Sequence, residues 1–192
     1  TFFELIQKLN EVKGIERYRI SSIEPNLLTE EMIDWITSGT KFLPHYHIPL
    51  QSGCDTILKE MGRRYDTAAF ARKIQYIREK SEVPGGPRVF FGIDVIVGFP
   101  GETEEEFMET YSFIRDQRFS ELHVFPYSKR TGTPAARLED QVDEEIKNER
   151  VHRLISLNDQ LAVEYASRFE GEVLEIIPEE VITSETGETM VE

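Results

Sequence analysis

Cysteine is almost absent from this chain: Cys54 is the only one among 192 residues. A single thiol excludes a disulfide within the chain and fits a protein of the reducing cytosol. It also excludes an iron–sulfur or structural zinc site built mainly from the chain's own thiolates. With no cysteine or histidine at ligand spacing beside it, Cys54 is interpreted as structural, and no metal ligand is expected in this chain.

Long apolar runs and basic residues are also scarce. No run approaches the ~18–20 apolar residues of a membrane span, and the N-terminus does not have the pattern of a signal peptide. Lysine and arginine number 22 against 36 acidic residues, a net charge of −14. Such an excess repels phosphate and argues against broad nonspecific binding of nucleic acid. Two basic pairs, Arg63-Arg64 and Lys129-Arg130, leave room for a local basic site, although most such pairs are solvated surface residues.

Four β-like segments each run into a turn rich in polar residues, glycine or proline. The junctions span residues 20–25, 47–53, 94–103 and 123–133. In a barrel of βα units, the chemistry sits at the carboxyl ends of the strands. Four such junctions in one chain therefore predict a site assembled at one end of a sheet.

The hydrophobic pattern alternates between strands and helices, which predicts a parallel sheet with right-handed crossovers. Four βα units are too few for a closed eight-stranded barrel, so an α/β open half-barrel is expected. The segment 89–97 is nearly all apolar and is expected to be buried on both faces. The other predicted strands are 17–23, 45–50, 122–127, 173–177 and a segment at 181. The predicted helices are 2–10, one that begins at Thr29, 56–61, one capped by Asp66 or Thr67, one capped by Thr103 with Glu106, and 142–169. A turn is predicted at 84–87, and a loop leads to about residue 141.

Several candidate site residues have two readings. The turn from Gly98 to Gly101 is neither common phosphate signature, and it is either an anion site at a helix N-terminus or a plain βα turn. His45 and His47 face the same side of a strand. In a functional role they would be ligands or acid/base groups; in a structural role they would be hydrogen-bonded residues of the barrel. Glu24 can bind a hydroxyl or an ammonium, or pair with a neighbouring arginine.

Together these segments resemble the radical S-adenosylmethionine (SAM) methylthiotransferases. The matching strings are HIPLQSG (47–53), LKEMGR (58–63), DVIVGFPGET (94–103) and YSKRTGTPAA (127–136), in the order and spacing of the family. The resemblance covers about residues 1–177. The strings SSIEP (21–25) and HVF (123–125) are similar to the branch that acts on threonylcarbamoyladenosine at tRNA position 37. Arg130 after Tyr-Ser-Lys resembles the tRNA-modifying members, whereas the ribosomal-protein branch tends to carry acidic residues there.

The resemblance implies a mechanism. A [4Fe-4S] cluster cleaves SAM, the 5′-deoxyadenosyl radical removes hydrogen from position 2 of the adenine ring, and a second cluster supports insertion of the methylthio group. The cluster ligands of the family, a C-x-x-x-C-x-x-C run and three earlier cysteines, are missing here. This chain is therefore expected to be an inactive piece of a longer enzyme that holds no cluster itself.

The resemblance also implies roles for parts of the chain. Residues 1–141 correspond to the later part of the barrel, 142–170 to a connecting helix, and 171–192 to the start of a small TRAM-like β domain. Expected partners are SAM and tRNA; no membrane is expected, the location is cytoplasmic, and no electron donor is indicated. The expected SAM contacts are Gln51, Ser52, Asp94, Gly98, Phe99 and Gly101, and the expected substrate contacts are Glu24, His47, Arg63, Tyr127 and Arg130.

Other functions stay open at this point. A related enzyme could act on isopentenyladenosine in tRNA or on a ribosomal protein. A phosphate-binding barrel or a noncatalytic module docking through 142–169 is also compatible with the pattern. A half-barrel leaves strand edges and an apolar lumen open, so self-association is expected.

Overall fold

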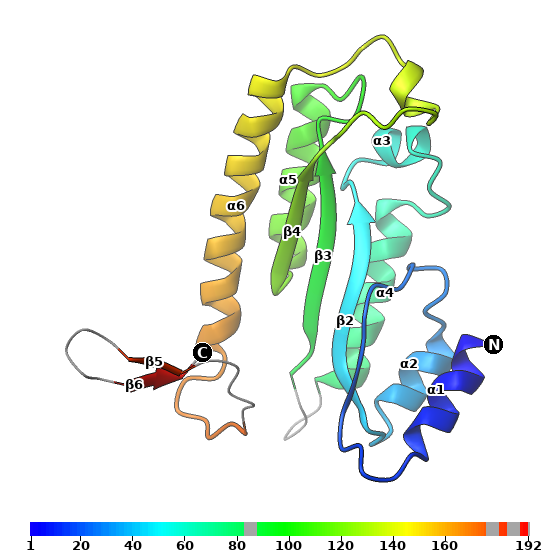
Figure 1. Cartoon of the computed structure of the whole chain (residues 1–192), viewed down its shortest axis with the longest axis vertical. Helices are drawn as coiled ribbons and strands as arrows, with labels where there is room; N and C mark the ends of the chain where they lie inside the picture. The colour runs from blue at the N-terminus through cyan, green and yellow to red at the C-terminus, as the bar shows by residue number, and fades with distance from the viewer. Residues whose placement is uncertain (83–87, 176–180, 184–188, 192) are drawn as a thin grey trace.

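A computed structural model describes residues 1–82, 88–175, 181–183 and 189–191. A parallel sheet of four strands, in the order β1-β2-β3-β4, forms its centre. The strands are β1 (Tyr18–Ile20), β2 (Phe42–Gln51), β3 (Phe90–Val97) and β4 (Glu121–Pro126). This confirms the expected open α/β half-barrel (Figure 1).

Six α-helices accompany the sheet in the described residues. They are α1 (Phe2–Asn10), α2 (Glu30–Ile36), α3 (Asp55–Glu60), α4 (Thr67–Ser81), α5 (Glu104–Gln117) and α6 (Glu144–Ser167), with a short 3₁₀ turn at Ala135–Arg137. The predicted caps are confirmed: Asp66 caps α4, and Thr103 forms a capping box with Glu106 on α5. Among the described helices, none is long and apolar enough to cross a membrane.

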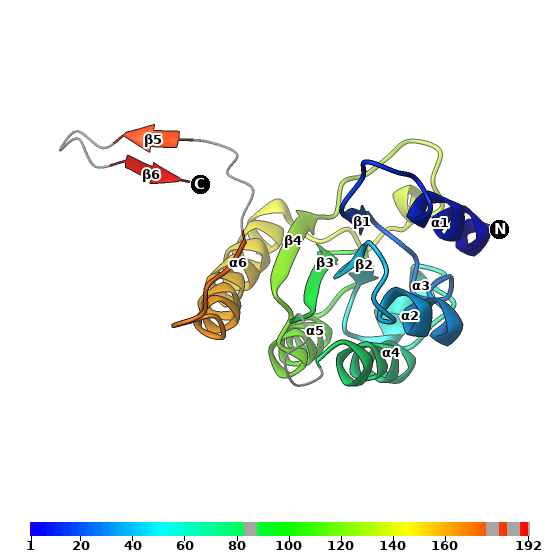
Figure 2. The ribbon, with the colours of Figure 1, turned by 90° about the horizontal axis from the view of Figure 1, so that it is seen from below.

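Helices α2, α4 and α5 cover one face of the sheet only (Figure 2). The residues of β2 and β3 that point to these helices are buried, among them Tyr46, Ile48, Phe91 and Ile93. On the opposite face, Phe90 and Asp94 of β3 are only partly buried. The expectation that 89–97 is buried on both faces was therefore wrong, because none of the described helices covers the lumen side of these two strands.

The strand bounds differ from the prediction where pairing is irregular. β1 is shorter than expected because its register against β2 shifts between Tyr18 and Ile20, although Ile23 N–H still donates to His47 O. β2 begins earlier and carries a second irregularity between Pro49 and Gln51. Proline lacks the N–H that a ladder needs, so a bulge at this position is expected.

The long helix α6 packs along β4 (Figure 1). Its buried face consists of Lys147, Arg150, Leu154, Leu157 and Leu161. The sequence pattern alone predicts an apolar side made of Ile146, Leu154, Ile155, Leu161 and Tyr165. Of these, Leu154 and Leu161 are buried. Ile146 and Ile155 are in fact exposed, because the two cations, through their aliphatic stems, take places on the packed face.

The chain after α6 is described only in part. Residues 173–175 are irregular, so the predicted strand 173–177 is wrong there and otherwise lies outside the described residues, as does the predicted turn at 84–87. The expected strand at 181 is β5 (Val181–Thr183), which pairs antiparallel with β6 (Thr189–Val191).

Candidate active site

A cavity of about 510 Å³ opens at the carboxyl ends of β2, β3 and β4. Four of the predicted site residues line it: Gln51, Asp94, Tyr127 and Arg130. Gln51 ends β2, Asp94 lies three residues before the end of β3, and Tyr127 and Arg130 follow β4. Because parallel strands deliver their chemistry at one edge, residues up to 79 positions apart meet here. The remaining lining residues are Ile96, Phe125, Pro126, Ser128, Thr133 and Ala135.

Gln51 closes β2 in a strained conformation. Its φ of 70° lies in the left-handed region, which is uncommon for a residue other than glycine. The backbone turn at Gln51 aims the next residue away from the cavity: Ser52 is fully buried, and its hydroxyl lies 3.0 Å from Thr110 Oγ1 of α5. Ser52 therefore supports the turn from behind and does not line the cavity.

The turn after β3 also supports the cavity from outside. Gly98 N–H donates to Glu102 Oε2 at 2.7 Å, and Gly101 N–H donates to the carbonyl of Asp140 at 2.7 Å. With these N–H groups engaged inside the protein, the reading as a plain βα turn fits better than an anion site. Phe99 packs edge-on against Tyr127, with ring centroids 5.5 Å apart, and so positions a residue of the cavity.

Helix α6 fixes this turn from the other side. Arg150 Nη1 lies 2.7 Å from Glu102 Oε2, and both side chains are almost fully buried. Burial raises the pKa of Glu102, although the Gly98 N–H and the Arg150 charge both favour its ionised form. Lys147 packs beside Gly98 and donates from Nζ to the carbonyl of Tyr127 at 3.2 Å. The two buried cations of α6 thus connect the turn after β3 with the end of β4.

Glu24 and Arg63 lie apart from the main cavity. Arg63 Nη1 donates to Glu24 Oε1 at 3.1 Å, so the expected alternative of pairing with an arginine is what the structure contains. The pair lines a separate hollow of about 260 Å³ next to Tyr65. The two residues hold each other in place, and the structure does not bring them together with Tyr127 and Arg130.

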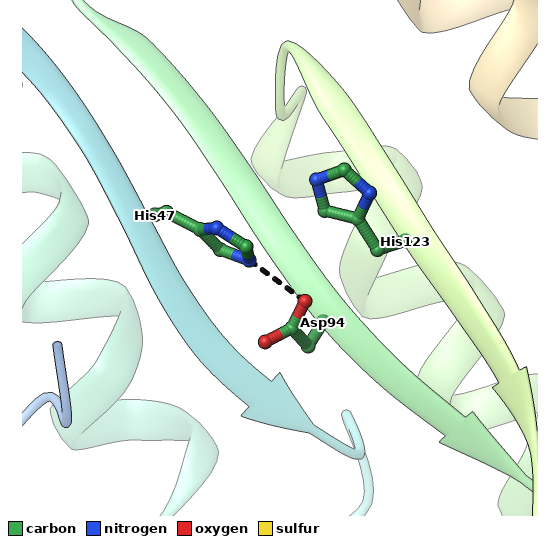
Figure 3. Close-up of side chains that lie close together, drawn as sticks. All are labelled: His47, Asp94 and His123. Atoms are coloured by element: carbon green, nitrogen blue, oxygen red, sulfur yellow. Dashed lines mark hydrogen bonds and ion pairs between the residues drawn. The ribbon is translucent and has the colours of Figure 1, made fainter. Parts of the chain in front are cut away.

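His47 and Asp94 meet on the lumen face of the sheet. His47 Nε2 lies 2.7 Å from Asp94 Oδ1, and His123 of β4 lies beside them, its ring centroid 4.9 Å from that of His47 (Figure 3). His45 shares this face but stacks on Phe90 at 4.4 Å. Burial, with the nearby charge of Arg19, lowers the pKa of His45 to about 4, so its ring is neutral at pH 7.

His123 was not among the residues predicted for the site. It pairs in register with Asp94, and each stands three residues before the last residue of its strand. This common offset from the strand end is the sequence signal that could have found it. Cys54, by contrast, is buried, and burial raises the pKa of its thiol, which agrees with its interpretation as a structural cysteine.

The family model of the radical SAM superfamily matches residues 1–114, more than half of the chain. The chain belongs to this superfamily. The coproporphyrinogen III oxidase HemN of Escherichia coli, a radical SAM enzyme, has the same fold, with a TM-score of 0.61 and 19% identity over 83% of this chain and 36% of HemN. The radical SAM methyltransferase TsrM of Kitasatospora setae gives a TM-score of 0.53 at 15% identity over 69% of this chain and 25% of TsrM.

Two curated relatives are much more similar in sequence. The chain is 57% identical over 190 residues to the threonylcarbamoyladenosine tRNA methylthiotransferase MtaB of Bacillus subtilis, covering 98% of this chain and 41% of MtaB. It is 39% identical over 179 residues to the tRNA-2-methylthio-N(6)-dimethylallyladenosine synthase of Thermoanaerobacter pseudethanolicus, covering 93% and 37%. The chain thus spans about two fifths of the length of these relatives, and the resemblance seen in its motifs is confirmed.

Proposed function

We propose that this chain is part of a tRNA methylthiotransferase that inserts a methylthio group at position 2 of threonylcarbamoyladenosine 37. The observation that carries the proposal is the 57% identity to MtaB over nearly the whole chain. Seven relatives named as dimethylallyladenosine synthases are 37–40% identical to the chain. This difference favours the threonylcarbamoyladenosine branch over the isopentenyladenosine branch.

The cavity suits SAM in size and chemistry. Its volume of about 510 Å³ lies within the range of roughly 300–1,000 Å³ for small-molecule sites. SAM carries a carboxylate, an ammonium group and ribose hydroxyls, and the cavity offers a guanidinium from Arg130, a carboxylate from Asp94 and an amide from Gln51. When bound, SAM supplies the radical chemistry of the superfamily.

The iron–sulfur clusters of the superfamily do not fit the residues of this chain. Cluster irons take cysteine thiolates, and the one cysteine here is buried with its pKa raised. The clusters would therefore be held by residues outside these 192. This chain would contribute the walls of the SAM and substrate site.

Each wall residue then has a proposed task. Gln51 and Asp94 bind polar groups of SAM, and Tyr127 and Arg130 lie on the side where the substrate nucleoside enters. Arg130 is exposed, so its charge is available to a carboxylate or phosphate. Phe99, Gly98, Gly101 and Ser52 act indirectly, because they hold the cavity residues in place. Glu24 and Arg63, as a pair in their own hollow, would contact tRNA further from the reacting base, and His47 orients Asp94.

The rest of the chain extends the proposal. Residues 171–192 would begin the TRAM-like domain, with the β5–β6 pairing as its first hairpin. The enzyme would work in the cytoplasm, where its tRNA substrate is found. An isolated chain should self-associate through the outer edge of β1, and light scattering at rising concentration measures this directly.

Nucleoside mass spectrometry of tRNA tests the proposed function. A strain lacking the gene of the full-length protein should lose methylthio-threonylcarbamoyladenosine and accumulate its precursor without the methylthio group. Returning the full-length gene should restore the product, whereas a gene for the 192-residue chain alone should not.

The other outcomes separate the alternatives. Loss of the methylthio derivative of isopentenyladenosine instead would move the enzyme to that branch. An unchanged tRNA profile would reject the tRNA reaction and direct attention to ribosomal proteins, and then to a noncatalytic role.

A further inference from the structure

Two histidines and a carboxylate gather on the lumen face next to the cavity. His47, Asp94 and His123 each offer a ligand atom, and these atoms all lie within 4.8 Å of one another. The three side chains come from β2, β3 and β4, which are adjacent strands of one sheet (Figure 3). Side chains on hydrogen-bonded strands are held more firmly than side chains on loops. The cluster is therefore set by the core of the fold.

We propose that His47, Asp94 and His123 form a binding site for a divalent transition-metal ion. Imidazole and carboxylate together suit Zn²⁺, Fe²⁺ and Co²⁺, and two histidines with one carboxylate are a recurrent ligand set for such ions. The site is separate from any iron–sulfur cluster, since it contains no thiolate. It gives His47 and Asp94 a role beyond the proposed one, in which Asp94 binds a polar group of SAM and His47 orients it, and its test does not require methylthiotransferase activity.

The spacing fits a metal with little movement. Two atoms bound to one tetrahedral zinc ion lie roughly 3.4 Å apart, given metal–ligand distances of about 2.1 Å. The pair His47 Nε2–Asp94 Oδ1 is closer than this at 2.7 Å, and no pair exceeds 4.8 Å. Small rotations of the side chains bring all three atoms to bonding distance. The hydrogen bond between His47 Nε2 and the Asp94 carboxylate requires a proton on Nε2. When a metal takes Nε2, the ring carries its proton on Nδ1, and the hydrogen bond is exchanged for two bonds to the metal.

The residue between the two rings leaves space for the ion. Gly92 lies between His47 and His123, and a Cβ there would stand 3.8 Å from His47 Cγ and 3.9 Å from His123 Nε2. Even a methyl group at this position would contact both rings. Glycine at this position keeps the floor of the site open.

The site is also open toward the cavity. All three ligands are only partly buried, and Asp94 itself lines the cavity. Three protein ligands leave at least one coordination position for water or for an oxygen or nitrogen atom of a bound molecule. An ion held here would present its free position to whatever occupies the cavity.

A titration of the purified 192-residue chain with Co²⁺, followed by its visible absorption and by competition with Zn²⁺, tests the proposal. We expect one tight site per chain. His47→Ala, Asp94→Ala and His123→Ala should each weaken binding at least ten-fold, because even the partners that only orient metal ligands change affinity by about 10–100-fold. The matched control is His152→Ala: His152 is exposed on α6 and should leave binding unchanged. Circular dichroism confirms that each variant is folded.

The four histidines of the chain allow a second readout. In ¹⁵N spectra of the imidazoles, Zn²⁺ should shift the signals of His47 and His123 and leave those of His45 and His152 in place. Equal binding by wild type and the His123→Ala chain would overturn the proposal, as would Zn²⁺ shifts spread evenly over all four rings. Either result would mean that His47 and Asp94 are only a hydrogen-bonded pair, with the imidazole of His123 beside them.

Discussion

Replacing Gly98 with alanine should destabilise the chain far more than the same replacement at Gly101. Both glycines belong to the turn after β3, and both have left-handed backbones, with φ of 70° and 84°. They differ in what surrounds them. A Cβ at Gly98 would lie 2.2 Å from Lys147 Cγ and 2.7 Å from Cδ, whereas a Cβ at Gly101 would have no atom of the described residues within 4 Å.

The magnitude follows from this difference. Each alanine meets the left-handed penalty of about 1–2 kcal/mol. Only the alanine at 98 also overpacks its surroundings, which adds about 1–3 kcal/mol. The atoms it meets are near the root of the Lys147 side chain, so the whole chain must move, and its bond from Nζ to the Tyr127 carbonyl is then lost.

Urea unfolding of the two single variants and of the wild type measures both costs. The double variant Gly98→Ala/Lys147→Ala completes a cycle: if the clash is the cause, Gly98→Ala should cost less in the Lys147→Ala background than in the wild type. Equal destabilisation by Gly98→Ala and Gly101→Ala would refute the reasoning, because it would leave only the backbone conformation as a cause.

The remaining predictions concern burial. Burial lowers the pKa of His45 to about 4. As the pH falls, the His45 ring therefore takes up a proton in the unfolded chain before it does so in the folded chain, and the free energy of unfolding should drop between pH 6.5 and 4. The urea midpoint of a His45→Gln chain should change less over this pH range than that of the wild type. Arg150→Met leaves a buried carboxylate without its partner and should cost about 3–5 kcal/mol. In the same urea assay Arg115→Met, at an exposed ion pair, should cost at most about 1 kcal/mol, and similar costs would contradict the argument. Gly53→Ala would place a Cβ 2.8 Å from the Thr110 Cα and should lower the melting temperature; an unchanged value would mean that α5 can move aside.

Periodicity was sufficient to predict the parallel sheet and the edge at which the cavity opens. Strand followed by polar turn occurs four times; the last three of these junctions contribute to the cavity, whereas Glu24 of the first lines a separate hollow. The choice of Gln51, Asp94, Tyr127 and Arg130 came from the family resemblance, and their roles stay a prediction.

The residues placed differently depend on contacts that no local pattern reveals. Ser52 turns inward because Gln51 adopts a left-handed backbone, and a glutamine carries no sign of that conformation. Lys147 and Arg150 are buried because their partners, Tyr127 and Glu102, come from other parts of the chain. From the sequence of the helix alone, such cations would be predicted to face the solvent.

The left-handed backbone of Gln51 has a consequence for how this position can vary over time. The conformation costs of order 1 kcal/mol or more for a residue with a side chain, and glycine or asparagine adopts it more readily. Selection for stability alone would thus tend to remove the glutamine, and the proposed use of its amide at the cavity would oppose that pressure. In gene copies released from function, position 51 should be among the first of the cavity residues to drift, and its identity would then serve as a marker that separates working copies from decaying ones.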